Sequence, residues 1–270
     1  MTSRLDAAVA ARGLARSRTH AAQLIDAGLV SVDGATVVKA SVRVEDDSVI
    51  QVAASDHYVS RAAHKLLAGL DAFGLDVTGR VALDMGASTG GFTQVLRERG
   101  ATPVIAVDVG HGQLAPSVAA DDQVIAVEGF NVRYMTPAAL VEASGVAVPP
   151  RIVTGDLSFI SLTHVLPAVA AVSAADADIV LLIKPQFEVG RTGVREGLVT
   201  DPGRRADAIA TVLWSAWDAG LGTHGLIASP IVGTHGNAEF VAHLQPGAAA
   251  DRGNPTVWLD VVDMLSRARA

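Results

Sequence analysis

Two lysines and two carboxylic acids stand where buried strands are expected to begin or end: Lys65, Asp156, Lys184 and Glu239. Ligands of open α/β sheets bind outside the carboxyl ends of the strands, so these four side chains are expected to share one crevice. Such a group suits proton transfer, because an amine can accept a proton while carboxylates orient it. A lysine titrates near ~10.4 in water, so it must lose its proton more easily to act as a base. Burial and a second ammonium favour that loss, and the carboxylates oppose it. Separate surface ion pairs are the alternative.

Lys184 is the strongest candidate for the base. It follows five apolar residues at 179–183, and Pro185 cannot continue a central strand, so the chain turns with Lys184 at the rim of the sheet. Only three of the 21 basic residues are lysines, and the arginines cannot supply a deprotonatable amine. The three lysines are either retained for that chemistry or left by chance.

A glycine-rich turn follows the strand expected at 81–85. It runs Gly86, Ala87, Ser88, Thr89, Gly90 and Gly91, and it opens a helix over 91–99. Such a turn lets the backbone pass closely under a ligand. Asp84 suits a methionine ammonium, and Asp108, at the end of the next strand, suits the two hydroxyls of an adenosine ribose. The pattern D-x-G-x-x-x-G therefore indicates a site for S-adenosylmethionine.

Other interpretations of this turn stay open. A dinucleotide site would have a second glycine where Ser88 stands. G-x-S-x-G is also the pattern of a serine hydrolase, with Ser88 as nucleophile and Asp156 and His235 as its partners. A purely structural turn is the third alternative.

Strands and helices alternate through the second part of the chain. Strands are expected at 81–85, 104–107, 152–154, 179–183, 226–229, 240–244 and 257–259, and helices at 91–99 and 201–220. This alternation predicts a mostly parallel, doubly wound α/β sheet.

The first 55 residues have the pattern of a separate small domain. Helices are expected over 4–12 and from the capping Ser17 to Gly28, and strands at 29–32, 36–38 and 49–52 surround a turn at 33–34. The predicted division is a first domain at 1–55, a linker at 56–64 and a second domain at 65–270.

Composition excludes several classes of protein. The chain has no cysteine, and its eight histidines form no ligand-spaced cluster, so we expect no metal site. No apolar run approaches the roughly 18 residues of a spanning helix, and no secretory signal is visible, which favours a cytoplasmic protein without membrane partners. The net charge of −7 counts against RNA binding, although arginines gather in the first eighteen residues. Oligomeric state cannot be read from the sequence.

These motifs resemble the TlyA-type rRNA methyltransferases, historically named haemolysins, which join an S4 RNA-binding domain to an FtsJ-like catalytic domain. The similarity covers essentially the whole chain and is most specific at 156–162 and 184–188. Further matches lie at 4–6, 17–18, 28–34, 60–61, 65–66, 83–93, 108–110 and 236–240.

The resemblance implies a Rossmann-like methyltransferase sheet with a small N-terminal α+β S4-like domain. It implies a Lys-Asp-Lys-Glu tetrad of Lys65, Asp156, Lys184 and Glu239, with methyl transfer from S-adenosylmethionine to the 2'-hydroxyl of cytidine in 16S or 23S ribosomal RNA, or in both. The implied cofactor residues are Asp84, Gly86, Ala87, Ser88, Thr89, Gly90, Gly91, Asp108, Glu128 and Asn131. In the S4-like part, Arg4, Arg16, Arg18 and Lys39 are candidates for phosphate contacts, and a solvated helical face is the alternative.

The sequence also departs from its relatives. Ala62 and Ala63 replace glycine, and residues 56–59 differ from the usual linker, which leaves the coupling between RNA docking and cofactor binding open. The glycine-rich segment 189–197 is expected to close over the substrate. The family's older name suggests a membrane-lysing activity, but the sequence has no basic amphipathic helix rich in aromatic residues.

Overall fold

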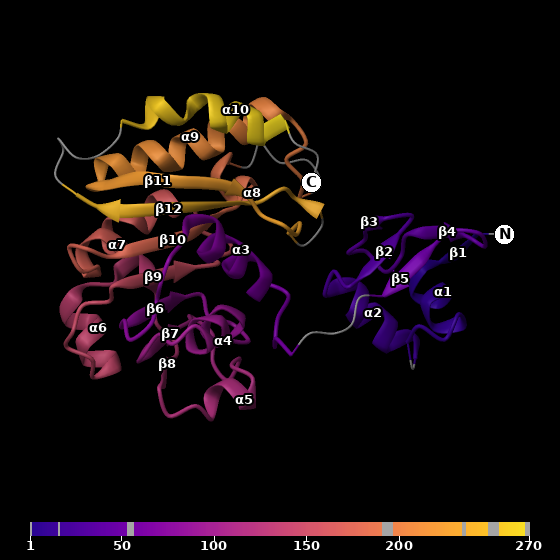
Figure 1. Ribbon diagram of the computed structural model, residues 1–270, viewed down its shortest axis with the longest axis horizontal. Coiled ribbons are helices and arrows are strands. Elements are labelled where there is room, and N and C mark those ends of the chain that lie inside the picture. Colours follow the sequence, from indigo (N-terminus) through magenta and orange to yellow (C-terminus); the bar gives the residue numbers. More distant parts are fainter. Residues whose placement is uncertain are drawn as a thin grey trace.

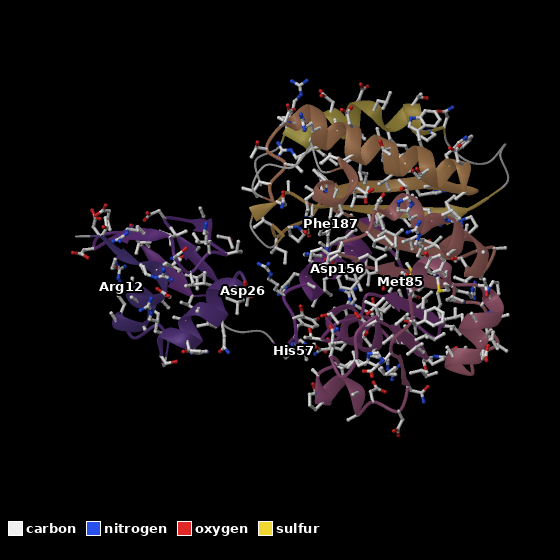
Figure 2. The ribbon with its side chains drawn as sticks, turned by 180° about the vertical axis from the view of Figure 1, so that it is seen from behind. Arg12, Asp26, His57, Met85, Asp156 and Phe187 are labelled. Carbon is white, nitrogen blue, oxygen red and sulfur yellow. The ribbon has the colours of Figure 1, made fainter. Side chains whose placement is uncertain are left out.

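The chain, described here from a computed structural model, folds as two units that follow one another in sequence (Figure 1). The structure describes residues 2–15, 17–52, 57–190, 197–233, 236–247 and 254–267. In the view from behind, Asp26 lies on the side of the N-terminal unit that faces the larger unit, and Arg12 lies toward its far side (Figure 2).

The N-terminal unit packs two helices against small antiparallel sheets. Its elements are β1 (Thr2–Arg4), α1 (Leu5–Ala11), α2 (Arg18–Asp26), β2 (Val30–Val32), β3 (Ala35–Thr36), β4 (Arg43–Glu45) and β5 (Ile50–Val52). Leu5, Val9 and Ile25 are fully buried in its core. Ser17 caps α2 as expected, because its side chain accepts a hydrogen bond from His20 N. The two predicted helices are confirmed, whereas the β1–β4 pair was not predicted, because β4 has a single apolar residue.

The larger unit is built on a seven-stranded sheet in the order β11-β12-β10-β9-β6-β7-β8. Its strands are β6 (Ala82–Met85), β7 (Val104–Val107), β8 (Val124–Val127), β9 (Ile152–Gly155), β10 (Asp178–Ile183), β11 (Leu221–Ala228) and β12 (Phe240–Pro246). The strands from β10 to β8 are parallel, and β12 lies antiparallel between β10 and β11. The predicted doubly wound, mostly parallel sheet is therefore confirmed.

Helices cover both faces of this sheet (Figure 1). They are α3 (Ala63–Phe73), α4 (Gly91–Glu98), α5 (Pro116–Ala119), α6 (Pro137–Ser144), α7 (Leu166–Val172), α8 (Pro185–Glu188), α9 (Pro202–Asp218) and α10 (Leu259–Arg267), with short 3-10 turns at Val132–Tyr134, Leu162–His164 and Pro255–Trp258. Alternate residues of β10 serve the two faces: Leu181 packs in the core under α7 and α9, and Leu182 packs in the core under α3 and α4. A strand buried on both sides explains the unbroken apolar run that precedes Lys184.

One predicted strand is wrong. Residues 257–259 lie where a 3-10 turn passes into α10, because Asn254 caps the turn through Thr256 N and Pro255 takes its first position. The buried Val262 then anchors α10 against the core that also contains α9. A short apolar run fits a strand or a helix equally well, and here the capping residues decide.

Candidate active site

The polar residues singled out in the sequence converge on one edge of the large sheet. The chain leaves β6, builds β7 and β8 on one side, and returns to β9 on the other, so the strand order reverses between β6 and β9. Ligands of doubly wound sheets bind at such a switch point. Gly86 follows β6, Asp156 follows β9 and Lys184 follows β10. Glu239 precedes the antiparallel β12 and therefore reaches the same edge.

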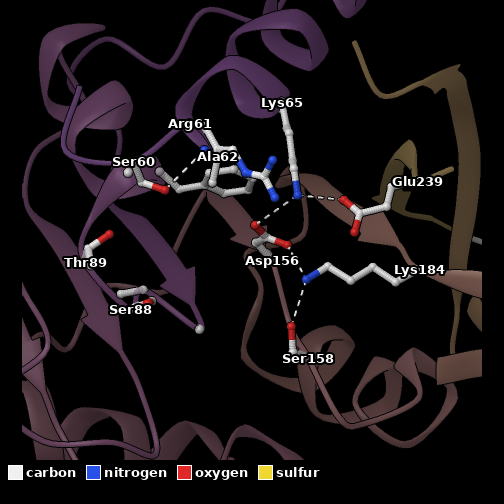
Figure 3. Close-up of a pocket in the computed structure, with 14 residues that line it drawn as sticks. Ser60, Arg61, Ala62, Lys65, Ser88, Thr89, Asp156, Ser158, Lys184 and Glu239 are labelled. Carbon is white, nitrogen blue, oxygen red and sulfur yellow. Dashed lines mark hydrogen bonds and ion pairs between the residues drawn. The ribbon is translucent and has the colours of Figure 1, made fainter. Parts of the chain in front are cut away.

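Lys65, Asp156, Lys184 and Glu239 meet there in one connected group (Figure 3). The Lys65 Nζ donates a hydrogen bond to Glu239 Oε2 at 2.6 Å and lies 3.6 Å from Asp156 Oδ2. The Lys184 Nζ lies 2.7 Å from Asp156 Oδ1. The partners Lys65 and Glu239 are 174 positions apart in sequence, so only the sheet topology can bring them together.

The group is buried and its charges nearly balance. Lys65, Lys184 and Glu239 are each 7% exposed or less. Burial pushes the pKa of Asp156 upward, but the charges of Lys65 and Lys184 outweigh that effect and hold the pKa below its ordinary value. The contact at Asp156 Oδ1 is an ion pair rather than a well-aligned hydrogen bond, because that oxygen has no hydrogen-bond partner by geometry. Asp156 is therefore a fixed negative charge shared by two amines.

Neighbouring loops hold Lys184 and Asp156 in place. The Lys184 Nζ donates a hydrogen bond to Ser158 Oγ at 2.9 Å. Glu188, at the end of α8, accepts hydrogen bonds from Ser161 Oγ at 2.5 Å and Leu162 N at 2.9 Å. These bonds join the loop after β9 to the loop after β10. Burial raises the pKa of Glu188, and its hydrogen bonds limit that rise.

The tetrad forms one wall of a polar cavity of about 240 Å³ whose opposite wall is the glycine turn. Gly86, Ala87, Ser88, Thr89 and Gly91 all line this cavity. Gly86 has a φ of +75°, and a Cβ there would lie 3.3 Å from the Asp156 carbonyl oxygen. A Cβ on Gly91 would lie 2.8 Å from Ser60 Cβ. The turn therefore needs glycine where it approaches the tetrad and the start of α3.

A second cavity, of about 490 Å³, adjoins the first through Gly86, Ser88, Asp156 and Ser158, which line both. Besides the shared residues, its polar lining residues are Asp108, Gln113 and Asn131. Its apolar lining residues are Val107, Val109, Phe130, Val132, Leu157, Phe159 and Ile160. Asp108 accepts hydrogen bonds from Ser88 N at 2.9 Å and Gly110 N at 2.8 Å, which aims its carboxylate along the wall. A slot with apolar walls, the Asp108 carboxylate and the amides of Gln113 and Asn131 fits an adenosine group.

Three of the cofactor residues expected from the sequence do not line either cavity. Asp84 is 1% exposed and accepts hydrogen bonds from Thr93 Oγ1 at 2.6 Å and Thr154 Oγ1 at 3.1 Å. Gly90 turns the chain at a φ of +94° just before α4. Glu128 accepts a hydrogen bond from Gly112 N at 2.7 Å and so closes the loop after β7. None of the three is a lining residue of either cavity, and Glu128 is exposed.

Two of the basic residues expected to meet RNA gather around one carboxylate in the N-terminal unit. Arg4 Nη2 lies 3.0 Å and Arg18 Nε 3.1 Å from Asp6 Oδ2. The hydrogen bond from Arg4 is the main cause that lowers the pKa of Asp6 to about 2. Lys39 is exposed and precedes Ala40, whose carbonyl accepts a hydrogen bond from Asp6 N. Arg16 lies outside the described residues.

The geometry of Ser88 resembles a hydrolase nucleophile in one respect only. Its φ of +47° is unusual for a serine, as at a nucleophile elbow. However, Asp156, the carboxylate needed to orient a histidine, is paired with two lysines. His235 and most of the expected lid at 189–197 lie outside the described residues.

Three residues at the site were missed as individual candidates. Ser158 contacts Lys184 directly, and Arg61 lines the first cavity. Phe159, which is 92% exposed with a φ of +64°, lines the second cavity and faces the Phe187 ring at 5.3 Å. All three belong to stretches that match the related family, but an isolated serine, arginine or phenylalanine has no spacing that marks its role.

The described residues contain no group of three or more histidines and acidic residues placed to hold a metal ion. Within the same residues, no helix has both the length and the apolar character needed to span a bilayer.

Two family models match the chain in the order of its two units. The S4 domain matches residues 3–50, and the FtsJ-like methyltransferase matches residues 58–245.

Individual proteins are similar over nearly the whole chain. The 16S/23S rRNA (cytidine-2'-O)-methyltransferase TlyA of Mycobacterium tuberculosis H37Rv is 48% identical, with 90% of each chain covered. Hemolysin A of Brachyspira hyodysenteriae is 36% identical, with 89% of this chain and 98% of that protein covered. A solved structure of a protein from Streptococcus thermophilus is 36% identical and superposes with a TM-score of 0.75. The match covers 98% of this chain and 95% of the chain in that structure.

Proposed function

Because the chain belongs to the TlyA-type family of FtsJ-like methyltransferases with an S4 domain, we propose that it transfers a methyl group from S-adenosylmethionine to the 2'-hydroxyl of cytidine in ribosomal RNA. The observation that carries this proposal is the buried tetrad beside the glycine turn. Such a substrate requires ribosomal subunits as the partner and the cytoplasm as the location. Either subunit, or both, can contain the target nucleotide.

The two adjoining cavities fit the proposed cofactor. The apolar slot with Asp108 and Asn131 suits the adenosine end of S-adenosylmethionine. The glycine turn, in which Gly86 lies close to Asp156, brings the protein backbone against the remainder of the cofactor. When bound, S-adenosylmethionine supplies an electrophilic methyl group on a sulfonium. We expect Gly86, Ala87, Ser88, Thr89 and Gly91 to hold it. Asp84, Gly90 and Glu128 then lie outside the residues that line the two cavities.

The two lysines are placed for different roles. The Lys65 Nζ lies against two carboxylates, Glu239 and Asp156, whereas the Lys184 Nζ lies against one carboxylate and the neutral Ser158 hydroxyl. More negative charge therefore lies next to the Lys65 Nζ than next to the Lys184 Nζ. Lys184 Nζ therefore accepts the proton of the 2'-hydroxyl, and Lys65 stays charged and orients the ribose oxygen. Asp156 and Glu239 hold the two amines in position.

Replacing Lys184 tests this assignment. Lys184→Ala should reduce methylation of unmodified ribosomal subunits by about 10²- to 10⁴-fold, because a positioned base contributes a factor of that size. S-adenosylhomocysteine should still bind, since Lys184 lies on the substrate side of the site. The measurement is transfer of labelled methyl groups, with calorimetry of S-adenosylhomocysteine as the control.

The Lys184→Arg variant serves as a matched control for charge. It keeps the positive charge but has no amine that can lose a proton, so it should be nearly as inactive as Lys184→Ala. Substantial transfer by either variant would remove Lys184 as the base.

A further inference from the structure

Arg61 is the unbalanced charge of the tetrad cavity. Arg61, Lys65 and Lys184 are the cations among the lining residues, and Asp156 and Glu239 are the anions. Lys65 and Lys184 are both paired with these carboxylates. The Arg61 Nη1 is buried and has no hydrogen-bond partner among the described residues. Each lysine therefore has a carboxylate partner, whereas no ion pair of Arg61 is found among the described residues that line the cavity.

An unsatisfied buried donor is costly, and more so when it carries a charge. Because such a group loses its hydration without gaining a partner, a ligand that accepts its hydrogen bonds would remove that cost. A guanidinium is satisfied best by an oxyanion, which accepts two parallel hydrogen bonds from its planar fork. The cavity is therefore built for a negatively charged group at Arg61.

The position of Arg61 identifies which anion this is. Arg61 precedes α3, the helix that carries Lys65, and its side chain lies near Gly28 of the N-terminal unit. A Cβ placed on Gly28, just after α2, would lie 3.3 Å from Arg61 Nη1. Arg61 thus lies between the unit expected to dock on RNA and the tetrad expected to act on it. S-adenosylmethionine has one carboxylate against a sulfonium and an ammonium, so it adds net positive charge to the cavity, whereas each nucleotide of RNA adds one negative charge.

We propose that Arg61 binds the phosphate group next to the target nucleotide and so sets the ribose against Lys184. This inference rests on the proposed function, because it assumes an RNA substrate. The phosphate would then be bound two residues before α3, the helix that carries Lys65. Arg61 is thus a substrate-binding residue that links docking of RNA to placement of the reacting oxygen.

The test is the salt dependence of RNA binding by Arg61→Met. Methionine keeps an apolar stem against Gly28 and removes the charge. Because the substitution removes a buried donor without a partner, the variant should fold with a melting temperature no lower than that of the wild type. Each phosphate contact contributes about 0.7 to the slope of log Kd against log salt for single strands. Arg61→Met should lower that slope by about 0.7 for unmodified ribosomal subunits, with about tenfold weaker binding at low salt. Arg61→Lys should recover part of the affinity.

Arg151→Met is the matched control, because Arg151 lies outside both cavities and pairs with Asp176 on the surface. It should leave the slope unchanged. An unchanged slope for Arg61→Met would overturn the proposal, and so would weaker binding of S-adenosylhomocysteine with RNA binding intact, which would assign Arg61 to the carboxylate of the cofactor. Failure of the proposed function is distinguishable, because the wild-type protein would then transfer no methyl group.

Discussion

At the scale of single residues, Asp84 is a carboxyl group in a buried position that disfavours its charged form. Burial raises its pKa to about 6, even though hydrogen bonds from Thr93 and Thr154 stabilise the charged form. It points from β6 toward α4, directly behind the glycine turn. A buried acid without a cationic partner is a cost to stability, which suggests that it is retained for the geometry of the turn.

Replacing Asp84 with asparagine should therefore stabilise the protein at neutral and alkaline pH. A carboxyl whose folded pKa is raised stabilises the protein fully below its unfolded pKa of ~3.9, and this stabilisation is lost as the pH rises through about 6. The advantage of Asp84→Asn in the free energy of unfolding should grow from near zero at about pH 4 to about 3 kcal/mol above pH 6. Urea denaturation at several pH values measures it. An advantage that does not change with pH would show that Asp84 is not neutralised by burial.

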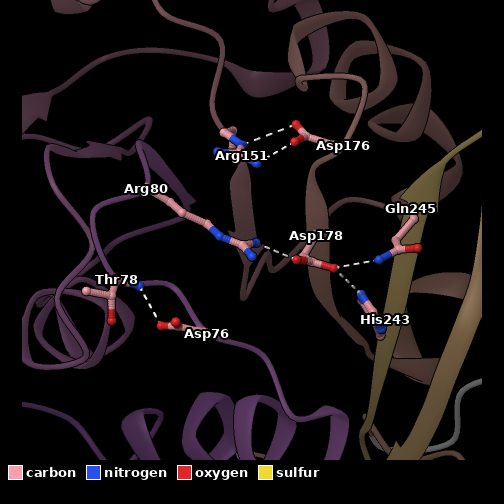
Figure 4. Close-up of polar contacts among 8 residues, drawn as sticks. All are labelled: Asp76, Thr78, Arg80, Arg151, Asp176, Asp178, His243 and Gln245. Carbon is pink, nitrogen blue, oxygen red and sulfur yellow. Dashed lines mark hydrogen bonds and ion pairs between the residues drawn. The ribbon is translucent and has the colours of Figure 1, made fainter.

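At the scale of elements, the placement of Glu239 depends on the register between β12 and β10. Asp178, the first residue of β10, accepts hydrogen bonds from His243 Nε2 at 2.8 Å, Gln245 Nε2 at 2.7 Å and Arg80 Nη1 at 2.6 Å (Figure 4). His243 and Gln245 both belong to β12, so Asp178 ties the two strands at the edge opposite the tetrad. A slip of one residue would turn the strand over, so this tie also fixes which way Glu239 faces.

Asp178→Ala should lower the free energy of unfolding by about 3 kcal/mol at pH 7, because it leaves buried partners unpaired. Burial raises the pKa of Asp178, but the bonds from His243, Gln245 and Arg80 outweigh that effect and hold it well below its ordinary value. A carboxyl with a lowered pKa stabilises the protein above its unfolded pKa of ~3.9, and this stabilisation is lost as the pH falls below that value. The deficit of the variant should therefore shrink in acid, as followed by chemical denaturation.

Asp176→Ala is the control for a surface pair, since Asp176 and its partner Arg151 are both exposed. Its effect should stay below about 1 kcal/mol at every pH. Equal effects of the two substitutions would mean that the Asp178 network does not hold β12.

The strands and helices that could be predicted are those in which the apolar pattern of the sequence matches the burial of the element in the fold. The strand before Lys184 was found because burial on both faces leaves an unbroken apolar run. β7 and β8 share the sequence Val-Ile-Ala-Val, yet only β7 was predicted. β8 lies at the edge of the sheet and is less buried than β7, although Asp121, Asp122 and Gly129 flank it as turn signals. Likewise, the four residues of the tetrad were identified, but their pairing and the neighbouring Ser158 and Arg61 depend on loops whose course the sequence does not encode locally.

At the scale of the whole molecule, an acidic chain must attract a polyanion through a local surface. Arg4 and Arg18 share Asp6 and leave one net positive charge, and both side chains are about half exposed or more. The Asp6 carboxylate holds both guanidinium groups in place, which orders them for phosphate contacts. Its negative charge lowers the net positive charge of this group of three residues by one. This arrangement makes the proposed binding of RNA compatible with a net charge of −7.

Replacing Arg4 and Arg18 together with alanine should weaken docking without changing chemistry. The KM for ribosomal subunits should rise about tenfold or more, while kcat and the affinity for S-adenosylhomocysteine stay unchanged. Arg12→Ala is the comparison in the same unit, because the Arg12 guanidinium donates to the backbone carbonyls of Glu45, Asp46 and Ser48 and so acts within the fold. A fall in kcat with KM unchanged would contradict a docking role for Arg4 and Arg18.

We propose that the tetrad catalyses methyl transfer from S-adenosylmethionine to a ribose oxygen of ribosomal RNA, and mapping of 2'-O-methyl groups tests this role most directly. Ribosomal RNA should be compared from cells with the protein, without it, and with the Lys184→Ala variant in its place. At least one cytidine should carry a 2'-O-methyl group only when the wild-type protein is present. Identical maps from all three strains, or a modification that persists with Lys184→Ala, would contradict the account.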